Sequence, residues 1–312
     1  MSGTIPLGEV AKSVTSRFNL VGLLPSALFA GGIGFLILSN SFHGAPDIHL
    51  LVVRLRAVNI FFASLVFLAV LAVALVVHPF QLLLVRTLEG YWDETPVLRH
   101  LRFIGVELNR RRRARLREVG GDTARLARRY PERIDDFLPT RLGNVLRAAE
   151  RRAGQKHGFT GPAEMLPRIY PYISAALDEG ISDARDTLDI ACRMCVVFWL
   201  LAVVSAIVFA IDGAIPASSG AWLCFPAVQA CLGVISYRGA IRAAEAYGQF
   251  LFLVFDLHRQ DLIRGLGYEP PDTPEEEVRL IRALTAWLVG GDLAPEEHWK
   301  IAVKDPAASS PP

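Results

Sequence analysis

Charged residues are distributed unevenly along the chain, and four long stretches contain none of them. Each stretch lacks Asp, Glu, Lys and Arg and consists mostly of apolar residues. About 20 such residues in a helix are enough to cross the hydrocarbon core of a bilayer. The pattern therefore predicts four transmembrane helices, over Leu20–Leu38, Ala57–Val77, Met194–Ile211 and Ser219–Tyr237.

These stretches predict helices rather than the strands of a barrel, because barrel strands alternate apolar and polar positions and these runs do not. The first two spans and the last two form two hairpins. Amphipathic sequence continues beyond each hairpin, and Pro79 is expected to kink the first continuation. The predicted fold class is all-α: a polytopic membrane protein with four transmembrane helices in two hairpins plus a cytoplasmic helical domain.

Composition and charge agree with this assignment and give it an orientation. The 312 residues are 52% hydrophobic, and the mean hydropathy is +0.34. Between Arg99 and Lys156 there are 17 Lys and Arg against 7 Asp and Glu, an excess typical of cytoplasmic loops. The turn Asp212–Ser218 has no basic residue and is expected outside. Arg54 and Arg56 lie in the first loop, which is expected outside. Even so, the arrangement that best keeps basic residues on the cytoplasmic side has both termini inside.

The chain is expected to divide at the ends of the hairpins. The predicted segments are 1–19 as a cytoplasmic N-terminal segment, 20–92 as the first hairpin with a cytoplasmic helix extension, 93–189 as an Arg-rich cytoplasmic helical domain, 190–264 as the second hairpin with its extension, 265–304 as an acidic helical region, and 305–312 as a disordered tail.

Three local patterns predict helix starts in the cytoplasmic segments. Thr140 and Ser182 are typical N-cap residues, and a helix capped at Ser182 would run without interruption into the third span. Thr273 followed by Pro274 gives a third start, with an apolar stripe after it. From Gly265 to the end there are 9 acidic and 4 basic residues, so this region is expected to pack on the basic middle region.

Cys192 and Cys195 form a Cys-x-x-Cys pair, the spacing of some redox and zinc sites. Zinc sites need about four ligands, and the two remaining cysteines, Cys224 and Cys231, lie far away in the sequence. The favoured interpretation is that all four are small apolar residues filling helix contacts. No metal, cofactor or catalytic site is predicted.

An arginine cluster is the most basic short segment. Close to a bilayer, each basic side chain gains about 1 kcal/mol from anionic lipid headgroups. Nucleic acid is the less favoured partner, because no aromatic residues for base stacking are interleaved. The residues predicted to contact anionic lipid are Arg110, Arg111, Arg112, Arg113, Arg115 and Arg117.

Small residues recur every four positions in the first span, at Gly22, Ser26, Ala30 and Gly34. Such ladders let helix backbones approach closely in lipid. The partner helix belongs either to the same chain or to a second copy, and the sequence leaves these two alternatives open.

Three segments carry a resemblance that covers the chain from about Arg17 to Leu288. They are "HPFQLLLVRTLEGYW", "LPTRLGNVLRAAE" and "FDLHRQDLIRGLG", and together they resemble uncharacterised integral membrane proteins of high-GC actinobacteria. The 29 arginines against 4 lysines fit GC-rich coding. The resemblance implies the four-span topology and a location in the bacterial cytoplasmic (inner) membrane, and it implies no activity or site residues.

The spans contain almost no ionisable residue, which disfavours an ion-coupled transporter. We expect a membrane-anchored scaffold or interaction protein whose helical domain binds a cytoplasmic partner. The alternative is a subunit of an oligomeric channel or pore gated by that domain, so a homo-oligomer is compatible with both. An enzyme is least favoured, since its site would combine distant residues such as Glu89, Asn144 and His258. The acidic and basic residues around His258 are more typical of a salt-bridged helix face.

Overall fold

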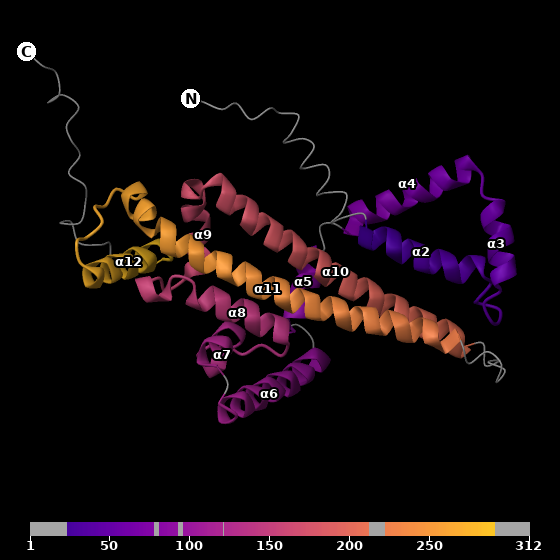
Figure 1. Ribbon diagram of the computed structural model, residues 1–312, viewed down its shortest axis with the longest axis horizontal. Helices are drawn as coiled ribbons and strands as arrows, with labels where there is room; N and C mark the ends of the chain where they lie inside the picture. Colours follow the sequence, from indigo (N-terminus) through magenta and orange to yellow (C-terminus); the bar gives the residue numbers. More distant parts are fainter. Residues whose placement is uncertain (1–23, 78–80, 93–95, 121, 212–221, 291–312) are drawn as a thin grey trace, which may run out of the picture. The chain divides into compact units, whose positions relative to one another are not determined.

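The computed structural model describes residues 24–77, 81–92, 96–120, 122–211 and 222–290, and these ranges are helical and contain no β-strand (Figure 1). The all-α class is therefore confirmed. The chain divides into two compact units. Unit 1 consists of Met1–Trp92 and Arg185–Ala243, and unit 2 consists of Asp93–Ala184 and Ala244–Pro312.

Within the described residues, four helices precede the Arg-rich region and belong to unit 1. They are α2 (Leu24–Leu38), α3 (Ile48–Arg56), α4 (Ile60–Val77) and α5 (Gln81–Glu89). Helix α2 packs against both α3 and α4. The predicted kink at Pro79 lies outside the described residues.

Unit 2 begins with α6 (Pro96–Glu118), which has 23 residues. Shorter elements follow it before the long helices: α7 (Thr123–Arg129), η3 (Ile134–Asp136), α8 (Arg141–Arg152), η4 (Gln155–His157), α9 (Pro162–Ile169) and η5 (Tyr170–Tyr172). Helix α12 (Pro274–Leu288) follows near the end of the described chain.

Figure 1 shows two long helices, α10 (Ala175–Ile211) and α11 (Cys224–Gly265). Each of them contributes residues to both units. They are the described helices that are long and apolar enough to cross a membrane. In unit 1 they run antiparallel, with Trp199 against Gly233 and Ser205 hydrogen-bonded to Gln229. The third predicted span lies within α10, and the fourth coincides with α11 from Cys224 to Tyr237, while its first residues, 219–221, lie outside the described ranges.

The first predicted hairpin corresponds to α2 and α4, whose described lengths are 15 and 18 residues. Both are strongly apolar, but each is short for a span, and residues before Leu24 lie outside the described ranges. Four spans in two hairpins therefore stays a prediction.

The first loop contains a helix that the sequence analysis did not predict. Asp47 caps α3 by accepting a hydrogen bond from the backbone N–H of Leu50 at 2.9 Å. Arg54, one of the two basic residues that complicated the orientation, donates to the carbonyls of Ile37 and Leu38 at 3.1 and 3.0 Å. A cation at these last carbonyls satisfies the C-terminal end of α2.

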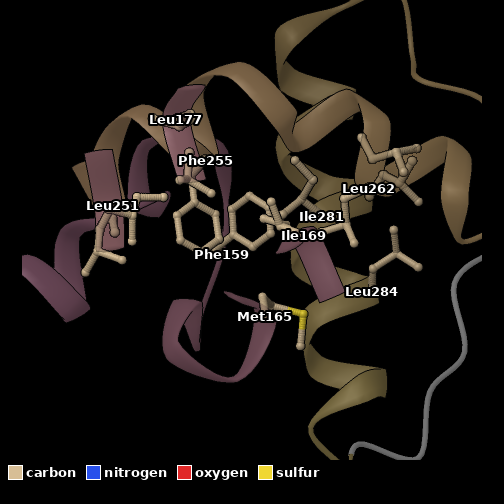
Figure 2. Close-up of a cluster of buried hydrophobic side chains, with 14 of the residues drawn as sticks. Phe159, Met165, Ile169, Leu177, Leu251, Phe255, Leu262, Ile281 and Leu284 are labelled. Atoms are coloured by element: carbon tan, nitrogen blue, oxygen red, sulfur yellow. The ribbon is translucent and has the colours of Figure 1, made fainter. Parts of the chain in front are cut away.

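A large apolar core joins helices of unit 2 and is shown in Figure 2. Phe159 and Phe255 meet edge to face, with ring centroids 4.8 Å apart. Gly158 has φ +94°, and a Cβ there would lie 2.4 Å from the carbonyl oxygen of Val278, so α12 approaches this turn closely. Helix α12 adds Leu280, Ile281 and Leu284, while α10 and α11 add Leu177, Ile181, Leu251, Val254, Leu262 and Ile263.

Two predicted helix starts are confirmed and one is wrong. The Thr140 side chain accepts from the N–H of Gly143, and the Thr273 side chain accepts from the N–H of Glu276. Ser182 is not a cap, because α10 begins at Ala175 and already includes it. Ser174 lies at that start instead, where its hydroxyl accepts from the N–H of Leu177 at 3.4 Å. The helix does continue through the cysteine pair, as predicted.

Truncation of Leu280, which is 0% exposed in the core, is expected to destabilise unit 2. Leu280→Ala removes buried methyl groups and leaves a cavity, at a cost of about 2–5 kcal/mol. Arg282→Ala is the matched control, since Arg282 is exposed on the same helix. Thermal unfolding of the purified protein measures both, and an equal shift for the two variants would show that α12 does not contribute to the core.

Candidate functional site

Helix α6 concentrates positive charge, with eight arginines against two glutamates. Its inner side is fixed by two residues. Asn109 is 2% exposed and donates from Nδ2 to the carbonyl of Pro139 at 2.8 Å. A Cβ on Gly105 would lie 2.6 Å from the Cβ of Pro139, so the helix backbone touches this segment directly. These contacts set the rotation of α6 about its axis and so decide which side chains face outward.

The segment under α6 is held from its other side by α8. Asn144 is fully buried and donates to the carbonyls of Leu138 and Thr140, each at 2.7 Å, while its Oδ1 accepts from the N–H of Leu138 at 3.0 Å. This amide makes the hydrogen bonds that a buried polar side chain requires. Its role is to position the chain between α6 and α8.

Many arginines of unit 2 outside α6 are paired with carboxylates. Arg129 meets Glu245 at 2.7 Å, and Arg152 meets Glu132 at 3.3 Å. Asp136 receives Arg151 at 3.1 Å. These side chains hold α7, α8 and α11 together, so a large part of the positive charge counted in the sequence has a structural use.

Three of the six arginines predicted to contact lipid also have partners within the chain. Arg111 meets Glu107 at 2.8 Å, and Arg110 lies 3.5 Å from the carbonyl of Ile134. The Arg113 guanidinium lies 5.5 Å from the centroid of the Phe137 ring. Burial, together with the neighbouring charges of other arginines, lowers the pKa of Arg113 from its ordinary value.

The other three, Arg112, Arg115 and Arg117, are exposed and make no hydrogen bond or ion pair with any residue that the structure describes. Their charge is therefore available to an external anionic surface. Contact with lipid stays a prediction for all six.

Apolar side chains accompany these arginines on α6, and the sequence analysis did not single them out. Leu101, Ile104 and Leu108 are 49%, 55% and 49% exposed. Their three- and four-residue spacing places them on one face of the helix and was the signal that could have identified them.

A small cavity of about 90 Å³ lies elsewhere in unit 2, between α8, α9 and α11. Its wall is mostly apolar and includes Leu166 and Phe255, with the Glu150 carboxyl as the charged group. Burial raises the pKa of Glu150, and the charges of Arg147 and Arg151 act in the opposite direction. At about 30 Å³ per molecule, the space suits a few waters.

Other polar clusters of unit 2 include ion pairs between its elements. Asp256 accepts from Lys156 at 2.8 Å and lies 2.9 Å from Nε2 of His157. Partial burial raises the pKa of Asp256, but these two hydrogen bonds outweigh it and leave the pKa below its ordinary value. Arg259 pairs with Glu277 of α12. These contacts agree with the predicted salt-bridged face.

The cysteines divide into two classes. Cys192 and Cys195 are free and buried at 0% and 2% exposure, which agrees with a role as apolar fillers. Cys224 and Cys231 are exposed, so the same interpretation is wrong for them within one chain. Among the described residues, no group of three or more His, Cys, Asp or Glu is placed to hold a metal ion.

The small-residue ladder of α2 is only partly in contact with the rest of unit 1. Gly22 lies outside the described residues, while Ser26 and Ala30 are half-buried. A Cβ on Gly34 would meet nothing within 4 Å. The close approach within the chain occurs at Gly32 instead, where a Cβ would lie 2.6 Å from the side chain of Leu201. The Gly34 end of the ladder is open to a partner.

Comparison of the chain with models of protein families, with curated proteins and with solved structures finds no match.

If α2 associates with a second copy through the ladder, Gly34→Leu is expected to reduce the oligomer population. Small residues allow the backbone contact on which such pairing depends. The variant should leave the fold of one chain intact, because the space at Gly34 is open. Gly32→Leu is the matched comparison and should destabilise the monomer through its collision with Leu201. Mass measurement in detergent decides, and an unchanged oligomeric mass for Gly34→Leu would refute pairing through this face.

Proposed function

We propose that this chain is a multi-pass protein of the bacterial cytoplasmic membrane that acts as a scaffold. Four spans in two hairpins anchor it, both termini lie in the cytoplasm, and unit 2 is the cytoplasmic helical domain that binds a protein partner. The resemblance to membrane proteins of high-GC actinobacteria supports the location.

The observation that carries the membrane assignment is the exposed apolar surface of the predicted spans. On α4, Ile60 is 87% exposed, Phe61 75% and Phe67 64%. On α10, Trp199 and Leu200 are about half exposed within the third predicted span. At about 25 cal/mol per Å², leaving such surface in water is costly, and contiguous apolar patches mark contact sites. Lipid removes this surface from water without a further protein.

The scaffold assignment is supported by the way the chain builds unit 2. Its core takes residues from α9, α10, α11 and α12, so two of the helices that carry predicted spans also carry core residues of the domain. A helix that continues without interruption connects an anchor directly to a domain. No catalytic role is needed for this arrangement.

An oligomeric channel is the alternative, and one observation favours the oligomer it requires. The Gly34 end of the α2 ladder is open to a second copy. Against a pore in one chain, the buried polar residues of the second predicted hairpin contact each other between the helices, since Ser205 Oγ lies 3.1 Å from Oε1 of Gln229 and also donates to the carbonyl of Leu201 at 2.6 Å. Side chains buried against each other in this way contribute no polar lining to a conducting path within the chain.

The proposed topology predicts which introduced cysteines a membrane-impermeant thiol reagent labels. In intact spheroplasts, His43→Cys in the first loop should be labelled, whereas Val119→Cys should be labelled only after permeabilisation. Both positions are exposed, and Val119 is 86% exposed. The wild-type chain sets the background from its own cysteines. Labelling of Val119→Cys in intact cells would place the Arg-rich domain outside and contradict the proposal.

A second measurement separates scaffold from channel. Purified protein in liposomes is expected to give no ion or dye flux above that of empty liposomes. A reproducible flux would favour the channel, and its loss in Gln229→Leu would locate the path at the polar pair. Flotation checks that the wild-type protein and the Gln229→Leu variant are both incorporated, so that an absence of flux means an absence of conduction.

A further inference from the structure

We infer that α6 lies in the membrane interface, with Leu101, Ile104 and Leu108 among the lipid acyl chains and the following arginines at anionic headgroups. This rests on the proposed membrane location and gives it a second contact, additional to the spans. The ligand surface is a bilayer leaflet that contains anionic lipid.

The orientation of α6 follows from its inner side. Gly105 and Asn109 are held against Leu138 and Pro139, so the helix cannot turn its apolar residues into unit 2. Leu101, Ile104 and Leu108 lie on the side of the helix that adjoins this inner side, and each is about half exposed. The apolar stripe therefore faces away from unit 2, and the side chains of the described residues do not bury it.

The same face becomes cationic in the second half of the helix. Arg111 and Arg115 follow Leu108 at three- and seven-residue spacing, and Arg112 borders them. Arg112 and Arg115 make no hydrogen bond or ion pair within the part of the chain that the structure describes. Helices that lie in a membrane interface combine an apolar face with basic residues, and binding grows with apolar area and with attraction to anionic lipid.

Other occupants match this face less well. A second copy would bring its own arginines against these, and like charges facing each other oppose association. Nucleic acid would use the arginines but leave the aliphatic stripe without a role, since base stacking requires aromatic rings or guanidinium planes. An acidic amphipathic protein segment would satisfy both halves, and the experiment below includes it as an outcome.

The chain also keeps α6 close to the bilayer if α4 is a span. Pro96, the first residue of α6, follows Val77, the last of α4, by 19 positions. A short tether gives a high effective concentration, so a helix with modest intrinsic affinity for lipid is still docked most of the time.

A photoactivatable benzophenone amino acid at position 104 tests the inference in the full-length protein. The protein is reconstituted in nanodiscs of zwitterionic and anionic phospholipid, illuminated, and analysed for adducts by mass spectrometry. Position 103 is the matched control. Phe103 is 76% exposed, but its side chain leaves the helix about 100° away from that of position 104. Lipid adducts are expected at 104, with several-fold fewer at 103.

Two sets of variants separate the apolar and the ionic contributions. Leu108→Ser should lower the ratio of docked to undocked helix by up to about tenfold. The lipid-adduct yield at 104 should fall with this ratio when docking is incomplete. Arg112→Gln with Arg115→Gln should lower the yield in anionic discs and have a smaller effect in zwitterionic discs. These residues are exposed, so the thermal unfolding of unit 2 should not change.

The outcomes distinguish this inference from the proposed function. Protein that does not enter the discs overturns both. Protein that enters but gives no lipid adduct at 104, or equal yields at 103 and 104, overturns the interfacial helix and leaves the spans intact. Adducts at 104 to an acidic segment of this chain or of a second copy, in place of lipid, would show that protein covers the face.

Discussion

The structure depends on how apolar side chains are removed from water. Unit 2 does this within the chain, because Phe159, Met165 and Phe255 pack with the apolar residues of α12 in one core. Unit 1 leaves much of α4 exposed, including Ile60 and Phe61. The same physical requirement that folds unit 2 leaves the apolar surface of α4 without cover in the chain, and in the proposed function a bilayer covers it without any specific complementary surface.

Charge is the second constraint, and the arginines of unit 2 fall into two groups, those paired with carboxylates and those exposed on α6. Arg129 and Arg152 face carboxylates and join helices of unit 2, whereas Arg112 and Arg115 face outward from α6. Exposed ion pairs contribute little stability on average, so the paired arginines act chiefly in positioning. The outward arginines have no such use in the fold, and this is why they are the better candidates for a role in binding.

Local signals predicted the parts of the fold that depend on short-range chemistry. Thr140 and Thr273 begin helices because a hydroxyl at the N-cap satisfies a nearby N–H, whatever the tertiary surroundings. Ser182 has the same chemistry, but the helix starts seven residues earlier, where Ala175 and Leu177 have good helix propensity and Leu177 enters the core. A cap signal predicts a start only where no earlier segment is stabilised by packing.

Long-range contacts could not be predicted in this way. Arg54 was expected to be a topological exception, but it satisfies the carbonyls that end α2, 16 and 17 residues earlier in the chain. The roles of Asn109 and Asn144 also depend on contacts, since both amides bind the backbone of Leu138 only after α6 and α8 have met around it. Of the candidate site, the sequence indicated the arginines through their clustering, while the spacing of the apolar stripe was a signal in the sequence whose exposure only the structure shows.

The outward face of α6 is therefore a consequence of its inward face. At Gly105 the absence of a side chain lets the helix backbone touch Pro139, and one turn later Asn109 fixes the rotation with a buried hydrogen bond. A larger residue at Gly105 would push the helix away and free it to rotate, and Leu101, Ile104 and Leu108 would then gain access to unit 2. Because burial of those side chains within the chain would be favourable, their exposure is maintained by specific contacts. Contacts that keep the apolar stripe of α6 exposed have a physical purpose if the stripe binds the membrane interface.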